Sequence, residues 1–205
     1  MSAVFQYNED KAIAADSGGG EYITESCVVR GFIEQAKWVE ASSGAKGLEL
    51  TFESEHGKKA NYLTLYYQKK DGSINEVGDQ QIQSLMGCTG AQSLSMTNNG
   101  SAMIAPELTR KPVQLALERE NYVKGNGQNG FRFQIKCIMS AKSGLTIAEY
   151  KAGKQAESAG YWAQRFAQNP QGEPPKQQAA QASGQYDYSN SYMPPADDDD
   201  STIPF

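Results

Sequence analysis

The sequence predicts a mainly β fold with one helix inside the strand order and another after it. Five runs rich in β-branched and aromatic residues alternate between apolar and polar positions, which is the pattern of a half-buried strand. A helical run separates the third of them from the fourth. Three strands, a helix, two strands and a terminal helix form the element order of an OB-fold, a five-stranded Greek-key barrel. We therefore expect an OB-fold-like barrel, a C-terminal helix and a disordered acidic tail.

The expected strands, in order, cover residues 27–41, 47–55, 60–70, 112–121 and 131–140. Clusters of Gly, Asn and Asp separate several of them, as expected for turns. The run DQQIQSLMGCTG (79–90) predicts the helix between the third and fourth strands. A last helix is expected over 146–167, where alanines and Phe166 recur on one stripe.

The hexapeptide GNGQNG (125–130) matches a dinucleotide-binding fingerprint letter for letter. That fingerprint requires a strand before it and a helix after it, whereas here the β-rich run FRFQIKC follows. Because Gly and Asn tolerate positive φ, Asn-Gly pairs between two strands predict a hairpin turn. We therefore expect no nucleotide cofactor at this position.

Composition divides the chain into four parts. Hydrophobic residues make up 39%, and the stretch from Asn169 to Asp200 contains no Leu, Val or Ile. Such a segment buries too little apolar surface to offset about 1–2 kcal/mol of backbone entropy per residue. We expect an N-terminal arm (1–21), a folded domain (22–168), a disordered linker (169–196) and an acidic tip (197–205).

The net charge of −5 is also unevenly placed. Residues 1–168 contain 18 Lys+Arg and 18 Asp+Glu, so the excess negative charge lies entirely in residues 169–205. An acidic protein would ordinarily be a poor partner for nucleic acid. The neutral folded domain removes that objection, because it can still present local basic patches.

Several function classes are disfavoured by residue content. Three widely spaced cysteines and one histidine, His56, provide no metal-binding or nucleophilic set, so we expect no metal, no cofactor and no enzymatic activity. No apolar run approaches the roughly 20 residues that cross a bilayer, and no secretory leader is apparent. We expect a cytoplasmic protein without a membrane partner.

The expected outer strand faces combine aromatic and basic side chains. The residues singled out are Arg30, Phe32, Trp38, Lys58, Lys59, Tyr62, Tyr66, Lys69, Lys70, Arg132 and Lys136, together with Arg110 and Lys111 at the end of the loop 98–111. An aromatic ring stacks on any nucleobase, and Lys or Arg neutralises phosphates without reading sequence. The pattern predicts binding to single-stranded DNA. The alternative is that these aromatic residues pack under the terminal helix or close the barrel.

The carboxyl end reads ADDDDSTIPF. The acidic run Asp197, Asp198, Asp199 and Asp200 precedes the apolar end Ile203, Pro204 and Phe205. A solvating acidic tail explains the aspartates but not the terminal Ile-Pro-Phe. The end suits a docking peptide, because the Phe205 ring can fill an apolar pocket while its carboxylate and the aspartates meet basic side chains.

This tip resembles that of bacterial single-stranded DNA-binding proteins, in which an OB-fold and a Gln/Gly/Pro-rich linker precede an acidic peptide ending in Ile-Pro-Phe. The chain departs from that pattern by inserting Ser201-Thr202 before Ile203. The region GLTIAEYKAG…YWAQRFAQNP resembles phage-encoded proteins of the same function. The resemblance implies docking on host or phage replication, recombination and repair proteins, and residence in the cytoplasm of a bacterial host.

The prediction is therefore a sequence-nonspecific single-stranded DNA-binding protein that coats and protects exposed strands, with a possible homo-oligomeric state. Three alternatives remain open at this point. The chain could be a recombination mediator or adaptor that hardly touches DNA, a metal-dependent single-strand nuclease, or an RNA-binding OB protein.

Overall fold

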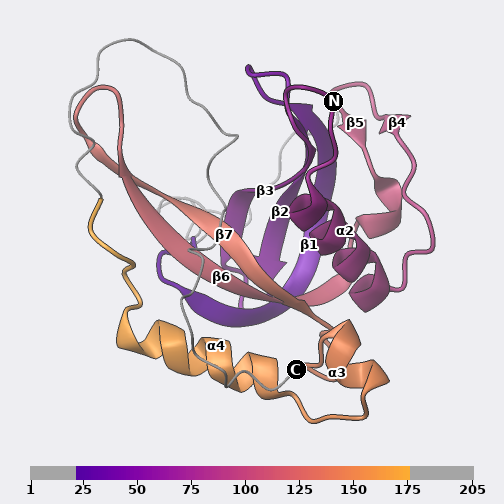
Figure 1. Ribbon diagram of the computed structural model, residues 1–205, viewed down its shortest axis with the longest axis vertical. Coiled ribbons are helices and arrows are strands. Elements are labelled where there is room, and N and C mark those ends of the chain that lie inside the picture. The colour runs from indigo at the N-terminus through magenta and orange to yellow at the C-terminus, as the bar shows by residue number, and fades with distance from the viewer. Residues whose placement is uncertain (1–21, 176–205) are drawn as a thin grey trace, which may run out of the picture.

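The computed structural model describes residues 22–175 and shows a mainly β protein built on one seven-stranded antiparallel sheet (Figure 1). The strands are β1 (Cys27–Glu40), β2 (Lys46–Ser54), β3 (Lys59–Gln68), β4 (Thr97–Asn98), β5 (Met103–Ile104), β6 (Pro112–Val123) and β7 (Asn129–Met139). The helices are α2 (Glu76–Thr89), the 3-10 turn η1 (Pro106–Leu108), α3 (Ile147–Lys151) and α4 (Glu157–Gln168). The five expected strands are confirmed, with bounds that differ by no more than two residues.

Strand β1 is the centre of the sheet because it has three partners. Its stretch from Gly31 to Glu40 pairs with β2, while its first half, Cys27–Phe32, pairs with β6 on the other edge. Further along that second edge, Lys37 pairs with Ile104 of β5. The long strands therefore run in the order β3, β2, β1, β6, β7.

The closed five-stranded barrel expected from the sequence is not present, because no strand ladder joins β3 to β7 among the described residues. Helix α2 occupies part of the edge that closure would need. Gln81 of α2 donates its Nε2 proton to the Ile135 carbonyl of β7 at 2.9 Å, and the Cys88 thiol contacts the Ile138 carbonyl. The short strands β4 and β5 were not predicted, since two residues are too few to show an alternating pattern.

The expected terminal helix is broken into α3 and α4. Gly153, with φ +64°, follows α3, and a short connection leads to α4. Glu149 joins the two pieces, because its carboxylate accepts hydrogen bonds from the backbone N–H groups of Thr146 and Ser158 at 2.8 and 2.6 Å. Within residues 22–175, no helix has the length and apolar character needed to cross a bilayer.

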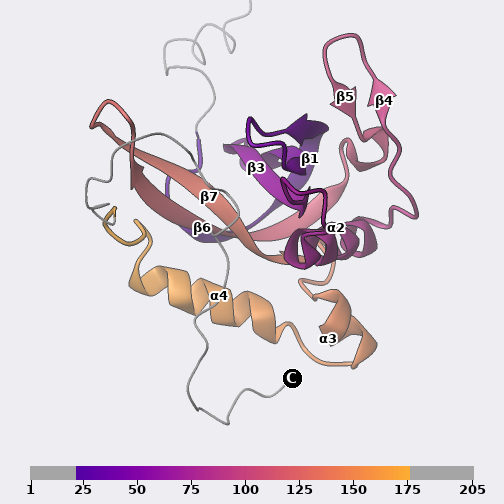
Figure 2. The ribbon, with the colours of Figure 1, turned by 45° about the horizontal axis from the view of Figure 1, so that its top comes forward.

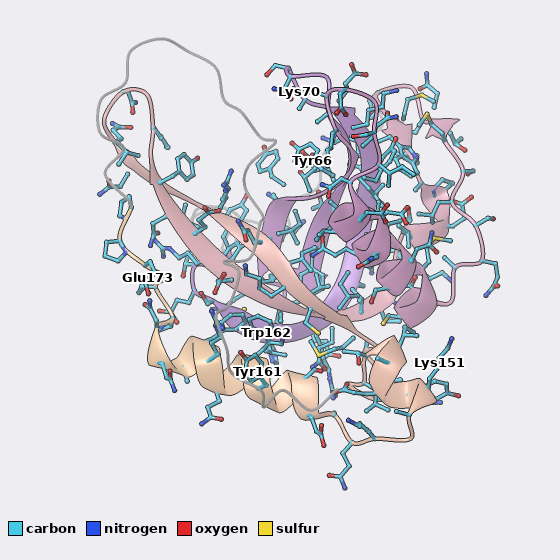
Figure 3. The ribbon with its side chains drawn as sticks, in the orientation of Figure 1. Tyr66, Lys70, Lys151, Tyr161, Trp162 and Glu173 are labelled. Atoms are coloured by element: carbon cyan, nitrogen blue, oxygen red, sulfur yellow. The ribbon has the colours of Figure 1, made fainter. Side chains whose placement is uncertain are left out.

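Two apolar clusters lie on opposite faces of the sheet. The larger one contains Ile33, Phe52 and Leu63, all fully buried on the inner face. The smaller cluster lies beneath α4, where Phe166 packs with Met139. Figure 2 shows α4 alongside β6 and β7, and the labelled Trp162 of Figure 3 lies between this helix and the sheet. Part of the outer face is thus covered, and the rest is open to solvent.

Candidate nucleic-acid interface

The first strand places Trp38 on the inner face, not on the outer face that the sequence predicted. A bulge at Glu34 shifts the register between β1 and β2, so the side-chain alternation restarts after Ile33. Trp38 then lies opposite the buried Leu48 and packs against the core. Its ring meets Tyr67 edge-on at 5.7 Å, and its Nε1 donates to the Ser95 carbonyl at 3.0 Å. This half-buried tryptophan is a packing residue.

A second bulge, in β3, exposes Tyr62. The register slips between the Leu50–Leu63 and Phe52–Ala60 pairs, and Tyr62 lies in the extra segment. Its side chain is 77% exposed, the largest exposure of any large hydrophobic residue described, and its φ is +61°. A bulky residue rarely adopts this left-handed conformation, which costs about 1 kcal/mol. The ring therefore contributes little to the core while its backbone is strained.

Phe32 and Arg110 form a stacked pair on the outer face. The Arg110 guanidinium carbon lies 3.9 Å from the centroid of the Phe32 ring. Arg110 is the other non-glycine residue described with positive φ, also +61°. Its N–H donates to the Ile33 carbonyl at 2.7 Å, and the Ile33 N–H donates to the Lys111 carbonyl at 3.0 Å. The two hydrogen bonds hold this strained segment against β1.

Arg30 lies two residues before Phe32 and is exposed. It faces Gln114 across the β1–β6 ladder and donates its Nε proton to the Gln114 Oε1 at 2.7 Å. The Gln114 side chain is buried and in turn contacts the Met139 sulfur at 3.7 Å. Sequence reasoning missed Gln114, although a single polar residue inside the apolar run PVQLAL was a usable signal.

Three of the predicted basic residues are paired with carboxylates. Lys59 contacts Glu34 at 2.9 Å, and its hydrogen bond to that residue raises the pKa of the ammonium group despite opposing desolvation. Arg132 pairs with Glu120 at 2.7 Å. Lys136, whose side chain is 12% exposed, pairs with Glu118 at 3.0 Å. Phosphate binding at these positions would have to compete with an internal anion.

The remaining predicted residues lie elsewhere on the surface. Lys58 is exposed in the β2–β3 turn, Lys111 is half-buried, and Lys69 and Lys70 are exposed in the turn after β3. Tyr66 is half-buried opposite Gly47, and Figure 3 shows it with Lys70 at the end of the molecule away from α4. The predicted set is therefore spread over several places. Among them, Phe32 and Arg110 are in direct contact, and Arg30 lies two positions before Phe32 on the same strand.

The β6–β7 hairpin carries a second aromatic face that the sequence reasoning did not select. GNGQNG forms its turn, as predicted, with Gly127 at φ +79°. Phe131 is 39% exposed, meets Phe133 edge-on at 5.7 Å and has the Arg119 guanidinium 4.1 Å from its centroid. Arg119 is held by the Thr24 carbonyl and the Gln171 side chain, both at 2.6 Å.

The cysteines are half-buried and form no disulfide. Burial, with help from nearby negative charge, raises the pKa of both Cys27 and Cys137 to about 11, and burial also raises the pKa of Cys88. These thiols stay protonated at neutral pH and are poor nucleophiles. Across residues 22–175, no cluster of three or more His, Cys, Asp or Glu side chains has the arrangement of a metal site.

Comparison with known proteins gives no family for this chain. No protein-family model matches it, and no curated protein matches it at a significant level. The predicted tip, from Asp197 to Phe205, lies outside the described residues. The case for a function therefore depends on the side chains of residues 22–175 and on the sequence of the tail.

Proposed function

We propose that this protein binds single-stranded DNA without sequence preference, coats and protects exposed strands, and recruits replication, recombination or repair proteins through its acidic tip. The resemblance to phage-encoded proteins implies residence in the cytoplasm of a bacterial host. Nucleobases stack on exposed rings, and arginines on the outer face neutralise phosphates.

The single observation that supports this proposal best is Tyr62. The Tyr62 ring is 77% exposed and its backbone has a strained, positive φ. The stability of the fold does not account for a tyrosine here, because the ring buries little surface and its backbone conformation is unfavourable. Strain of this kind is found most often at functional sites. An exposed tyrosine ring on a β-strand can serve as a stacking platform for a base.

The strand order also favours the proposal. Three consecutive antiparallel strands, a helix, and a hairpin whose first strand returns to β1 follow the OB-fold order, although the sheet is open between β3 and β7. We propose that the fold is an open variant of that barrel. OB-folds commonly bind oligonucleotides on their exposed strand face, so this relationship supports the proposal.

The tip would supply the protein partners. Four aspartates and a terminal phenylalanine match a pocket with a basic rim, as argued from the sequence. Deleting residues 197–205 should preserve or raise affinity for DNA and abolish capture of such partners. Weaker DNA binding after this deletion would contradict the separation of the two activities.

The decisive experiment replaces Tyr62 with glycine in the full chain. Glycine accepts positive φ, so the free energy of unfolding should change by less than about 1 kcal/mol. Loss of the stacking ring should weaken binding of fluorescent oligo-dT by about 1–3 kcal/mol, or roughly 5- to 150-fold. Fluorescence anisotropy titration at low ionic strength measures the affinity, and urea unfolding measures the stability.

Two control variants make the result specific. Tyr62→Phe keeps the ring and should bind like the original chain. Tyr150 on α3 is 73% exposed, so Tyr150→Ala removes a comparably exposed ring from another part of the molecule and should leave the affinity unchanged. Unchanged affinity in Tyr62→Gly would overturn the proposed role of this ring, and an original chain that ignores oligo-dT would overturn the function.

A further inference from the structure

We propose that Arg30 and Arg110, arranged beside Phe32, form a clamp for the phosphodiester groups of a single strand, with the buried Gln114 as the residue that positions Arg30. The inference rests on the proposed function and goes beyond it, because it assigns phosphate contacts to one place on the outer face and base stacking to Tyr62.

The strand geometry brings the three side chains together. Arg30 and Phe32 are two positions apart on β1, ahead of the bulge, so they point to the same face about 7 Å apart. The Arg110 guanidinium then lies over the Phe32 ring at 3.9 Å. The Arg30 guanidinium is held at Gln114 and the Arg110 guanidinium is stacked on Phe32, so two cations from segments far apart in the sequence lie at neighbouring outward positions of β1.

Gln114 fixes the direction of the Arg30 side chain. Arginine has only donors, so the Gln114 oxygen must face Arg30, and the amide nitrogen is left for the Met139 sulfur. The glutamine is 5% exposed, which restricts its own movement. Because Nε is engaged at 2.7 Å, the terminal NH2 groups remain to donate to a ligand. A guanidinium held in this way loses little freedom when it binds a phosphate.

Arg110 is positioned by its backbone. Its φ of +61° is maintained by the hydrogen bonds that join the 110–111 segment to Ile33. The conformation directs the side chain back over β1, where stacking on Phe32 orients the guanidinium plane. The donors at the edge of that plane stay available, since stacking uses only its face.

The two arginines differ from the other outer-face cations in having no carboxylate partner among the described residues. Neither Arg30 nor Arg110 forms an ion pair with any of residues 22–175, whereas Lys59, Arg132 and Lys136 each pair with a glutamate. Two glutamates face the pair across the β1–β2 ladder. Glu53, opposite Phe32, lies 3.8 Å from the Lys59 ammonium group. Glu55, whose N–H donates to the Arg30 carbonyl at 3.0 Å, forms no ion pair with either arginine. The two arginines thus keep a net positive charge that an external anion can neutralise.

The test compares two ligands: oligo-dT and an abasic oligonucleotide of equal length, which keeps the phosphates and lacks the bases. Arg30→Gln and Arg110→Gly should each lower affinity for both ligands by about 5- to 10-fold at low salt. Each should also make the plot of log affinity against log salt shallower by about 0.7, the value for one phosphate contact on a single strand. Tyr62→Gly should affect oligo-dT only.

Two further variants test positioning and charge separately. Gln114→Met keeps the volume and both arginines, so affinity should fall several-fold while the salt slope stays unchanged. Arg30→Lys should behave similarly, because it keeps the charge and loses the planar fork. Lys151→Gln on α3 removes an exposed cation elsewhere and should change neither quantity. Unfolding midpoints establish that each variant is folded.

The possible failures are distinguishable. If the original chain binds oligo-dT while Arg30→Gln, Arg30→Lys and Arg110→Gly bind with its affinity and salt slope, the clamp is wrong and the proposed function stands. If the original chain binds neither ligand, the proposed function fails and the clamp fails with it. An unchanged affinity in Gln114→Met overturns the positioning role alone.

Discussion

Two regions of the outer sheet surface both carry basic side chains, but the basic side chains contact neutral groups in one region and glutamates in the other. Beside Phe32, Arg30 meets a neutral amide and Arg110 meets an aromatic ring. Toward the β6–β7 hairpin, Arg132 and Lys136 meet Glu120 and Glu118. The first region keeps its positive charge and the second neutralises it. A count of basic residues on a face therefore does not give the potential of that face.

Strand β6 is responsible for the difference. Its outward positions are Pro112 and Gln114 opposite Phe32 and Arg30, and Glu118 and Glu120 next to the β7 cations. One strand thus presents neutral residues to β1 and carboxylates to β7. Variants at the junction of β1, β2 and β6, beneath α4 and at the paired cations test this contrast, with expected effects that decrease in that order.

Gly31→Ala should disrupt the region around Arg30 and Phe32, because Gly31 lies between them at the junction where β1 pairs with both Ser54 of β2 and Val113 of β6. A Cβ at this position would collide with the Glu53 carbonyl and lie 2.7 Å from the Ser54 Cα. Overpacking against backbone should cost about 3 kcal/mol of the free energy of unfolding, measured in urea. A loss below about 1 kcal/mol would show that the junction is not tightly packed.

The matched control for this variant is Gly160→Ala. Gly160 lies inside α4, and nothing occupies the space that its Cβ would take. Alanine favours a helix interior over glycine by about 0.5–1 kcal/mol, so this variant should be slightly more stable than the original chain.

The covered part of the outer face should be sensitive to alkaline pH. Cys137 packs under α4, and its pKa is raised to about 11 by burial, against an ordinary value of 9.0. A raised pKa stabilises the fold below the unfolded-state value, and this contribution is lost as pH rises from about 9 through 11. This difference in pKa corresponds to at most about 3 kcal/mol, less the solvent screening of a half-buried group. Cys137→Ala should flatten the pH dependence of urea unfolding over this range, and an unaltered dependence would contradict the assignment.

Removing the glutamate partner of an outer-face cation should help DNA binding more near Phe32 than near the hairpin. Glu34→Gln removes the main partner of Lys59, while Glu120→Gln removes one partner of Arg132. We expect Glu34→Gln to raise affinity for oligo-dT about 2- to 5-fold at low salt, in line with the small energies of exposed ion pairs. Glu120→Gln should have less effect. Equal gains from both variants would mean that the strand reaches the hairpin as well.

The strands were predictable because alternation and turn residues are local signals. Alternation in the run ANYLTLYYQ places Leu63 and Leu65 opposite the outer-face Tyr62 and Tyr66, and both leucines are buried in the structure. Asn-Gly repeats likewise indicated the β6–β7 turn. The bulge at Glu34 was not predictable in this way, since one extra residue reverses every later side chain. Trp38 was assigned to the wrong face for that reason.

The sequence could not predict which side chain each basic residue of the candidate site contacts. Lys59 and Glu34 are 25 residues apart, and Arg30 and Gln114 are 84 apart. Which cation meets a carboxylate depends on strand register, and no short-range pattern encodes it. The residue types of the outer face were thus largely predictable, while the choice between Arg30 and Arg132 needed the fold.

The segment after α4 has a practical consequence for where the chain can be cut. Ser26 donates its N–H to the Pro170 carbonyl at 2.7 Å, and the Asn121 amide donates to the carbonyls of Gln171 and Glu173 at 2.7 and 2.8 Å. These contacts shield the edge of β6 beyond its pairing with β1. A chain that ends at residue 168 would expose the backbone groups of that edge to pairing with other chains, which favours aggregation. A shortened chain should therefore keep residues up to 175.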